Sequence, residues 1–180
     1  MACLDLTGRS CLVVGGGRVG LDKAQGLLEC GALVTVVAPQ ASPEVQALAA
    51  EWRAREYETA DLEGHLIVTA ATDIRALNER VAGDAAQRGM LCNVVDQPDL
   101  CTFILPAVHR NGPIAVAIST GGASPALAQW LRAKIAEVVG PEHARIAHQL
   151  QDLRPWAKRN LATYEERRDY FQRLVERALG

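Results

Sequence analysis

Short apolar runs alternate with amphipathic segments through the first half of the chain. The runs are partly β-branched and end in glycine, proline or polar residues, which is typical of strands buried on both faces of a sheet. Such strands are predicted at residues 10–15, 32–39, 65–72 and 90–96, with a short additional strand at 56–58. Apolar residues at helical spacing predict helices between them, at residues 18–31, 43–55 and 73–89. This alternation with short connections predicts an α/β fold with a doubly wound parallel sheet.

The pattern changes after residue 100. Two apolar runs flank Arg110-Asn111-Gly112-Pro113, and Asn-Gly is a strong hairpin signal, so two antiparallel strands are predicted there. The rest of the chain is predicted to be helical at 126–140, 141–160 and 163–180, with Pro141 and Pro155 as punctuation. These changes divide the chain into the segments 1–112, 113–140 and 141–180.

Composition excludes several classes of function. The 180 residues are 49% hydrophobic but only 4% aromatic, and the formal net charge is −2, so no nucleic-acid partner is expected. No apolar run approaches the ~20 residues that span a bilayer, and the N-terminus lacks the basic and apolar regions of a signal peptide. The five cysteines form no CxxC pair, and Cys11 and Cys92 lie in apolar runs. We therefore expect no membrane contact, buried thiols in a reducing cytoplasm, and no metal site.

The charged residues are unevenly distributed along the chain. Residues 1–100 hold 8 Lys and Arg against 14 Asp and Glu, whereas residues 101–180 hold 11 against 7. Ordinary solvated helix faces account for this asymmetry, and the alternative is that the second half contacts an anionic molecule.

A glycine-rich turn carries the main chemical signal. Gly15, Gly17 and Gly20 form G-x-G-x-x-G between the first predicted strand and the first predicted helix, the context in which this pattern binds a dinucleotide. Gly15 allows a tight turn, Gly17 lets the backbone approach a pyrophosphate, and Gly20 lets the helix pack against the strand. The start of the helix, with Arg18 and Val19, offers N–H groups to the phosphates. The sheet is therefore predicted to be of the Rossmann type, and a glycine-rich turn that binds nothing is the alternative.

The end of the second predicted strand lacks the acidic residue expected at a dinucleotide site. Dinucleotide-binding domains of this type usually carry a carboxylate ~20 residues beyond the glycine turn, where it holds the ribose hydroxyls of NAD. The corresponding residues 37–42 are VAPQAS, with neither an acid nor an arginine suited to a 2′-phosphate. The strand end therefore leaves NAD and NADP open, with backbone groups, Gln40 or Ser42 available for the ribose.

Four further segments occur in a fixed order within residues 5–135. They are LVVGGGRVGLDKA, TAATD followed by LN, CNVVDQPDLCTFILPA, and AISTGGASPALAQWLR. Together they resemble the precorrin-2 dehydrogenase family, which includes the dehydrogenase–ferrochelatase module of sirohaem synthase. The resemblance implies oxidation of the anionic tetrapyrrole precorrin-2 to sirohydrochlorin with NAD as cofactor, and iron insertion in bifunctional members.

The resemblance also implies an intertwined homodimer. Residues 1–112 would then be the NAD-binding Rossmann domain, residues 113–140 the dimerisation segment, and residues 141–180 a small C-terminal helical domain. The basic residues of this last segment suit the carboxylate arms of the substrate, although a solvated face explains most of them.

Asp96 is the candidate catalytic residue. It follows the fourth main strand, at the sheet edge where doubly wound proteins bind ligands. The resemblance assigns the family's essential aspartate to this motif. A carboxylate here can take a proton as hydride leaves, or guide a metal ion. The structural alternative is that Asp96 before Gln97-Pro98 simply starts a turn.

Two groups of residues complete the predicted site. The cofactor site comprises Gly15, Gly17, Arg18, Val19, Gly20, Ala38, Pro39, Ala71 and Thr72. The substrate site comprises Asn93, Ser119, Thr120, Gly121, Gly122 and Ser124. A glycine pair before a helix forms an anion cradle, whereas Ser124 and Pro125 also fit the cap and first position of a helix. The small residues of TAATD either approach a cofactor or pack against a helix.

Two other functions remain as alternatives to a dehydrogenase. A dinucleotide-sensing regulatory module would need no chemistry at Asp96. A short-chain dehydrogenase would need Tyr-x-x-x-Lys, and none of the three tyrosines is followed by lysine at that spacing. We therefore predict a cytoplasmic, homodimeric, NAD-dependent precorrin-2 dehydrogenase. Because the histidines form no ligand pattern and the 180 residues include no methyltransferase segment, ferrochelatase activity is expected to be weak or absent.

Overall fold

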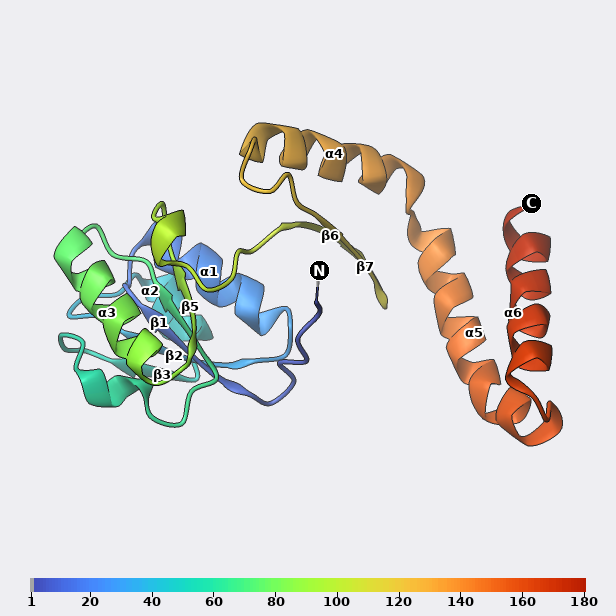
Figure 1. Cartoon of the computed structure of the whole chain (residues 1–180), viewed down its shortest axis with the longest axis horizontal. Helices are drawn as coiled ribbons and strands as arrows, with labels where there is room; N and C mark the ends of the chain where they lie inside the picture. Colours follow the sequence, from blue (N-terminus) through green and yellow to red (C-terminus); the bar gives the residue numbers. More distant parts are fainter. Residues whose placement is uncertain (1) are drawn as a thin grey trace. The chain divides into compact units, whose positions relative to one another are not determined.

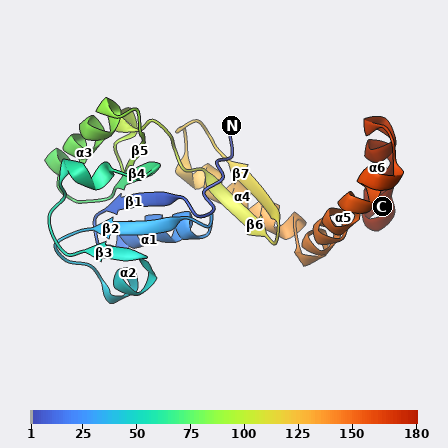
Figure 2. The ribbon, with the colours of Figure 1, turned by 90° about the horizontal axis from the view of Figure 1, so that it is seen from below.

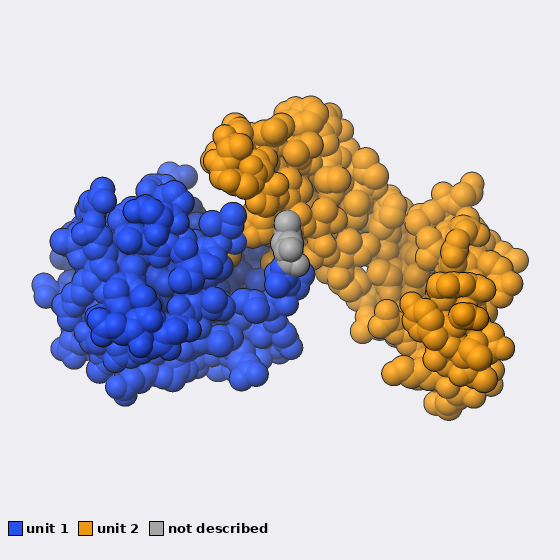
Figure 3. Space-filling model, in the orientation of Figure 1, with its two compact units in different colours: residues 1–104 blue, residues 105–180 orange. Residues whose placement is uncertain are grey.

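The computed structural model describes residues 2–180, so residue 1, the start of the first expected domain, lies outside the described residues. The chain forms two compact units, Met1–Ile104 and Leu105–Gly180 (Figure 3). The division falls before the hairpin, whereas the sequence placed it at residue 112, within the hairpin. The two hairpin strands pair only with each other and pack against helices of the second unit, which explains the earlier boundary.

The first unit is built on a five-stranded parallel sheet (Figure 1). Its strands are β1 (Ser10–Val14), β2 (Leu33–Val37), β3 (Glu51–Arg53), β4 (Ile67–Ala70) and β5 (Leu91–Val94). Their order is β3-β2-β1-β4-β5, so the chain winds outward from β1 in one direction and then in the other. The doubly wound α/β fold is confirmed, and the reversal between β1 and β4 creates a crevice at their carboxyl ends.

Helices cover both faces of this sheet (Figure 2). They are α1 (Arg18–Leu28), α2 (Pro43–Leu48) and α3 (Arg75–Gln87), with short 3₁₀ turns η1 (Thr59–Leu62) and η2 (Pro98–Leu100). Alternate residues of β1 enter two separate cores. Cys11 and Val13 pack with residues of α1 and α2, whereas Leu12 and Val14 pack with residues of α3. Burial on both faces explains why the strands lack polar alternation.

The helix predicted at 43–55 is wrong in its second half. Helix α2 ends at Leu48, and residues 51–53 instead form strand β3 along the free edge of β2. The indole N–H of Trp52 donates to the carbonyl oxygen of Ala38 at 3.1 Å, which fastens β3 to the end of β2. The strand predicted at 56–58 is also absent, because Tyr57 turns into the core and its hydroxyl donates to Asp84 at 3.0 Å.

The second unit begins with the predicted hairpin. Strands β6 (Ala107–Asn111) and β7 (Ile114–Ile118) pair antiparallel around a tight turn, where Gly112 has a φ of 55°. Three helices follow, α4 (Pro125–Val138), α5 (Pro141–Asn160) and α6 (Tyr164–Leu179). Ser124 caps α4 and Pro125 is its first residue, as the sequence predicted. None of the helices among residues 2–180 combines the length and apolar character needed to cross a bilayer.

Pro155 lies inside α5 and does not end it, so the prediction that Pro155 marks a helix boundary is wrong. The residues that follow it are held by packing within the helical pair. Ala157 is fully buried, and the ring of Trp156 lies 5.4 Å from that of Tyr170 on α6. These contacts keep the chain helical despite the lost backbone donor.

Candidate functional site

A cleft of about 970 Å³ lies at the carboxyl edge of the first unit's sheet. Its walls come from the glycine turn after β1 and from the segments that follow β2, β4 and β5. Nine of the predicted site residues line it: Gly15, Gly17, Arg18, Val19, Ala38, Pro39, Ala71, Thr72 and Asp96. The structure therefore places the predicted cofactor turn and the predicted catalytic carboxylate in one cavity, at the position where doubly wound sheets bind ligands.

Gly15 and Gly20 shape the turn from within. Gly15 has a φ of 124°, and a Cβ there would lie 2.8 Å from the carbonyl carbon of Ala71. Its N–H donates to Val37 at 3.0 Å. Gly20 does not line the cleft, and a Cβ there would collide with the carbonyl oxygen of Gly15. Only glycine fits at either position, and the reason is close backbone packing.

Gly16 is a cleft residue that the sequence analysis did not single out. A Cβ there would collide with the carbonyl oxygen of Gln40, and the Gly16 oxygen accepts from the N–H of Ser42 at 3.1 Å. The glycine turn is thus packed directly on the loop after β2. Of the two residues left for the ribose, Gln40 lines the cleft, whereas Ser42 caps α2 by accepting from Val45.

Gly17 differs from the other glycines of the turn because the space beside it is open. A Cβ at this position would meet no atom within 4 Å. Gly17 is also the N-cap of α1, and no side chain among residues 2–180 caps the first N–H groups of that helix. An open backbone surface at an uncapped helix start fits a bound pyrophosphate, so the residues present suit a dinucleotide.

The loop after β4 is fixed by Thr72 and Asn78. The hydroxyl of Thr72 donates to Asn78 Oδ1 at 2.7 Å, and Asn78 Nδ2 donates to the carbonyl oxygen of Thr72 at 2.9 Å. Asn78 is buried on α3 and lines the cleft. Asn78 was not among the predicted site residues, although it is the asparagine of the Leu-Asn pair in the family-like motif.

Asp96 lies on a turn with unusual geometry at the end of β5. Its φ is 58°, and it is the one non-glycine residue with a positive φ in the described chain. The N–H of Val95 donates to Ala70 at 3.0 Å, which holds the turn against the end of β4. Gln97 also lines the cleft, and its Oε1 is buried with no hydrogen-bond partner among residues 2–180. Backbone strain and a buried unpaired acceptor in one turn are typical of functional sites.

Asn93, predicted to bind substrate, does not line the cleft. It is buried on β5, where its Nδ2 donates to the carbonyl oxygen of Phe103 at 3.1 Å. This contact gives Asn93 a structural role.

The remaining predicted substrate residues all lie in the second unit, just before α4. The Ser119 hydroxyl accepts from Gly121 at 3.2 Å, and the N–H of Ser124 donates to Thr120 Oγ1 at 3.1 Å. Gly121 and Gly122 both have positive φ, and the hydroxyl of Ser124 accepts from Leu127 at 3.2 Å. These residues therefore lie close together, and the hydroxyl groups of Ser119, Thr120 and Ser124 all take part in local hydrogen bonds.

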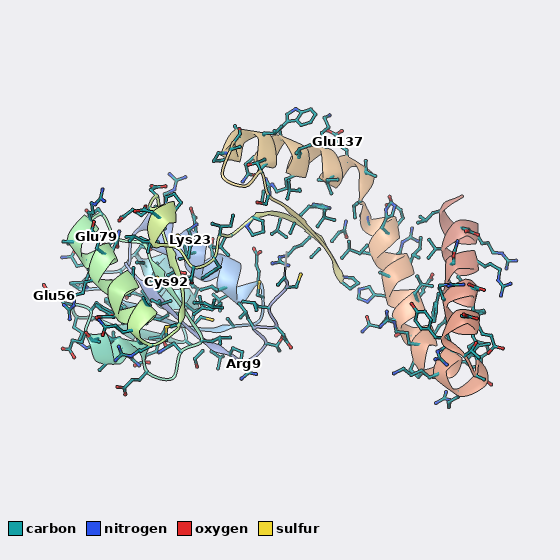
Figure 4. All side chains as sticks on the ribbon, viewed as in Figure 1. Arg9, Lys23, Glu56, Glu79, Cys92 and Glu137 are labelled. Carbon is teal, nitrogen blue, oxygen red and sulfur yellow. The ribbon has the colours of Figure 1, made fainter. Side chains whose placement is uncertain are left out.

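Charges of both signs surround the cleft. The basic residues that line it are Arg18, Arg75 and Arg80, and the acidic ones are Glu56, Asp73 and Asp96. Glu56 and Glu79, labelled in Figure 4, lie at the periphery of the unit and are exposed. Burial, together with the hydrogen bond to Asp84, raises the pKa of Tyr57 far above its ordinary value. The hydroxyl group of Tyr57, which lines the cleft, therefore stays uncharged at physiological pH.

The cysteines behave as the sequence predicted. Cys11 and Cys92 are buried, and burial raises the pKa of each thiol to about 11. Figure 4 labels Cys92 among the elements of the first unit. Within residues 2–180, no three His, Cys, Asp or Glu side chains gather in a way that would hold a metal ion.

Comparisons with known proteins identify the family of the chain. The family model described as "Putative NAD(P)-binding" matches residues 2–107, and the model described as "Sirohaem biosynthesis protein central" matches residues 111–137. The sirohaem synthase of Thioalkalivibrio sulfidiphilus is 42% identical over 177 residues, and that of Methylococcus capsulatus is 41% identical over 177 residues. These matches cover 96% of this chain but only 36% and 37% of the two relatives, so the chain spans little more than a third of their length.

A solved structure matches nearly the whole chain. It is titled "SirC, precorrin-2 dehydrogenase", and it matches with a TM-score of 0.81 and 27% sequence identity. The match covers 97% of this chain and 88% of SirC, so both units have counterparts there. The chain therefore belongs to the NAD(P)-binding family of sirohaem biosynthesis, the precorrin-2 dehydrogenase family that its sequence motifs resemble.

Proposed function

We propose that the protein oxidises precorrin-2 to sirohydrochlorin with NAD as the hydride acceptor. The observation that carries this proposal is the shared cleft, in which the open glycine turn and the Asp96 turn face one cavity. The likeness to SirC over almost the whole chain supports the same substrate.

The glycine turn forms the proposed cofactor site. The uncapped start of α1 at Gly17 would hold the pyrophosphate through backbone N–H groups. When bound, the nicotinamide ring supplies the acceptor for a hydride. We assign NAD and not NADP, because residues 37–42 carry no basic side chain for a 2′-phosphate and Glu56 adds negative charge to the cleft.

Asp96 is proposed to act as the general base. Oxidation of the macrocycle removes a hydride and a proton, and the carboxylate of Asp96 takes the proton. Asp96 suits this role because its side chain is exposed and it lines the cleft. Arg18, Arg75 and Arg80 surround the same cavity, and guanidinium groups are good partners for the substrate's carboxylate arms.

A cytoplasmic homodimer formed through residues 113–140 is part of the proposal. The hairpin is a two-stranded sheet, which is marginally stable without further cover. Leu127 and Trp130 on α4 are 49% and 57% exposed. A second copy that covers these apolar residues would stabilise the segment.

The decisive experiment mixes the purified protein with precorrin-2 and NAD under anaerobic conditions. We expect the absorption spectrum of sirohydrochlorin and one NADH for each macrocycle oxidised, with a slower reaction when NADP replaces NAD. Tight NAD binding without any turnover would overturn the proposal and favour a dinucleotide-sensing module.

A further inference from the structure

We propose that Cys101 is a positioning residue for Asp96, acting through a thiol bridge across the turn that carries the carboxylate. This inference rests on the proposed function, because it assigns to Cys101 the task of aiming the proton acceptor of that reaction. Cys101 itself does not line the cleft.

The sulfur of Cys101 contacts both ends of the Asp96 turn. The N–H of Val94 points to Sγ at 3.1 Å, and Sγ lies 3.2 Å from the carbonyl oxygen of Val94 and 3.4 Å from that of Gln97. A thiol has one proton, so it accepts from Val94 and donates to one of the two carbonyls at a time. Val94 and Gln97 bracket Asp96, and the N–H of Gln97 donates to the carbonyl oxygen of Val94 at a long 3.4 Å, so the thiol reinforces a turn that one backbone hydrogen bond also spans.

The bridge is itself held in place by the segment that follows it. The N–H of Thr102 donates to the carbonyl oxygen of Cys92 at 2.8 Å, and Thr102 Oγ1 accepts from the N–H of Cys92 at 2.7 Å. The next residue, Phe103, accepts from Asn93. Residues 101–103 therefore run along the outer edge of β5, and the sulfur cannot drift away from the turn without breaking these bonds.

The direction of the Asp96 carboxylate depends on its backbone. Among residues 2–180, no hydrogen bond reaches that carboxylate, so side-chain partners do not fix its direction. The φ of 58° is a costly conformation for a residue other than glycine, and it persists only where the surroundings enforce it. Without the thiol bridge, the long Gln97–Val94 hydrogen bond of 3.4 Å is left to span the turn, so the turn can relax and the carboxylate then moves relative to its target.

A matched pair of substitutions at Cys101 tests the bridge. Cys101→Ala removes both hydrogen-bonding functions, and we expect kcat to fall by about 10-fold or more, because small misplacements of reacting groups are costly. Cys101→Ser keeps a donor and an acceptor and should recover most of kcat. The affinity for NAD should stay unchanged in both variants, since the glycine turn lies on another strand. Cys11→Ala, which removes a buried thiol from the other core, is the control and should keep wild-type kcat.

A double-mutant comparison separates positioning from a general structural effect. If Cys101 acts through Asp96, adding Cys101→Ala to Asp96→Asn should lower kcat by less than about 2-fold, because the residue being aimed has already lost its function. Effects that multiply in the double variant, or an unchanged kcat in Cys101→Ala, would overturn the inference.

Amide hydrogen exchange of the protein without cofactor gives a readout that does not depend on activity. The Val94 amide should exchange faster in Cys101→Ala than in wild type, and Cys101→Ser should restore its protection. Equal protection in all three proteins would overturn the bridge. If wild-type protein fails to oxidise precorrin-2, the proposed function fails, whereas the exchange experiment still decides whether Cys101 holds the turn.

Discussion

The carbonyl oxygen of Gly15 occupies the space that a side chain at Gly20 would need. The two residues lie on opposite sides of one tight turn, and their contact fixes where α1 begins relative to β1. Gly17 stands between them in sequence but faces open space in the cleft. One glycine motif thus contains two different physical roles, and substitutions should separate them.

Gly17→Leu should leave the fold intact and abolish NAD binding. A Cβ at position 17 meets no protein atom, but a branched side chain would fill the space that the pyrophosphate needs. Gly20→Ala should instead destabilise the protein. The added methyl group overpacks the turn and should lower the free energy of unfolding by about 1–3 kcal/mol. Calorimetry with NAD and thermal unfolding measure the two effects. A folded Gly17→Leu protein with unchanged NAD affinity would show that the turn does not hold the cofactor.

Asp96→Asn should lower turnover by about 10²–10⁴-fold while NAD binding survives. Asparagine tolerates a positive φ, so the turn should keep its shape and only the proton acceptor is lost. Steady-state rates with precorrin-2 and binding measurements with NAD give the comparison. Full activity in this variant would mean that Asp96 serves the turn alone.

Iron insertion into sirohydrochlorin should be much slower than the oxidation step. The cleft offers Asp96 as a receiver of pyrrole protons, and the sequence places no His or Cys ligand pattern beside it. The measurement is the rate of sirohaem formation after addition of ferrous iron to the purified protein. Rapid insertion that depends on Asp96 would contradict this expectation.

The stability of the first unit should decrease in acid because of Asp61. Burial raises the pKa of this carboxyl group, but hydrogen bonds from Arg55, the Glu58 backbone and Arg53 outweigh it and lower the pKa to about 2. The unfolded chain has the ordinary value of about 3.9. The stabilisation is therefore complete above that value and is lost as the pH falls toward 2, with a magnitude on the order of 2 kcal/mol.

Urea unfolding at a series of pH values tests this relation. The Asp61→Asn variant should be less stable than wild type at pH 7, and the difference should shrink between about pH 4 and about pH 2. A difference that stays constant over this range would remove Asp61 from the acid response.

Sedimentation should show a dimer at micromolar concentration. Trp130→Glu should weaken that dimer, because it places a charge on a 57% exposed apolar surface that the partner would cover. Lys134, which lies 5.9 Å from the Trp130 ring, offers a control in Lys134→Gln that should associate normally. A stable wild-type monomer would contradict the proposed assembly.

Local signals in the sequence determined most of the elements. The apolar runs predicted β1, β2, β4 and β5 because both faces of a parallel sheet are buried, and Asn111-Gly112 predicted the hairpin through its turn geometry. Ser124 and Pro125 marked the start of α4 because capping depends on adjacent residues. The glycine spacing likewise pointed to the cleft, since its conformational demands are local.

Contacts between distant residues decided the rest. Residues 51–53 became a strand because β2 offered a free edge and Trp52 reached the carbonyl oxygen of Ala38, a pairing that helical spacing does not encode. No sequence pattern distinguished Cys101 from the other cysteines. The fold places its sulfur against Val94 and Gln97, on either side of Asp96. Sequence patterns report which residues neighbour each other along the chain, whereas the backbone turn at Asp96 is held by hydrogen bonds from Val95 to Ala70 and from Val94 to Cys101, which only tertiary folding creates.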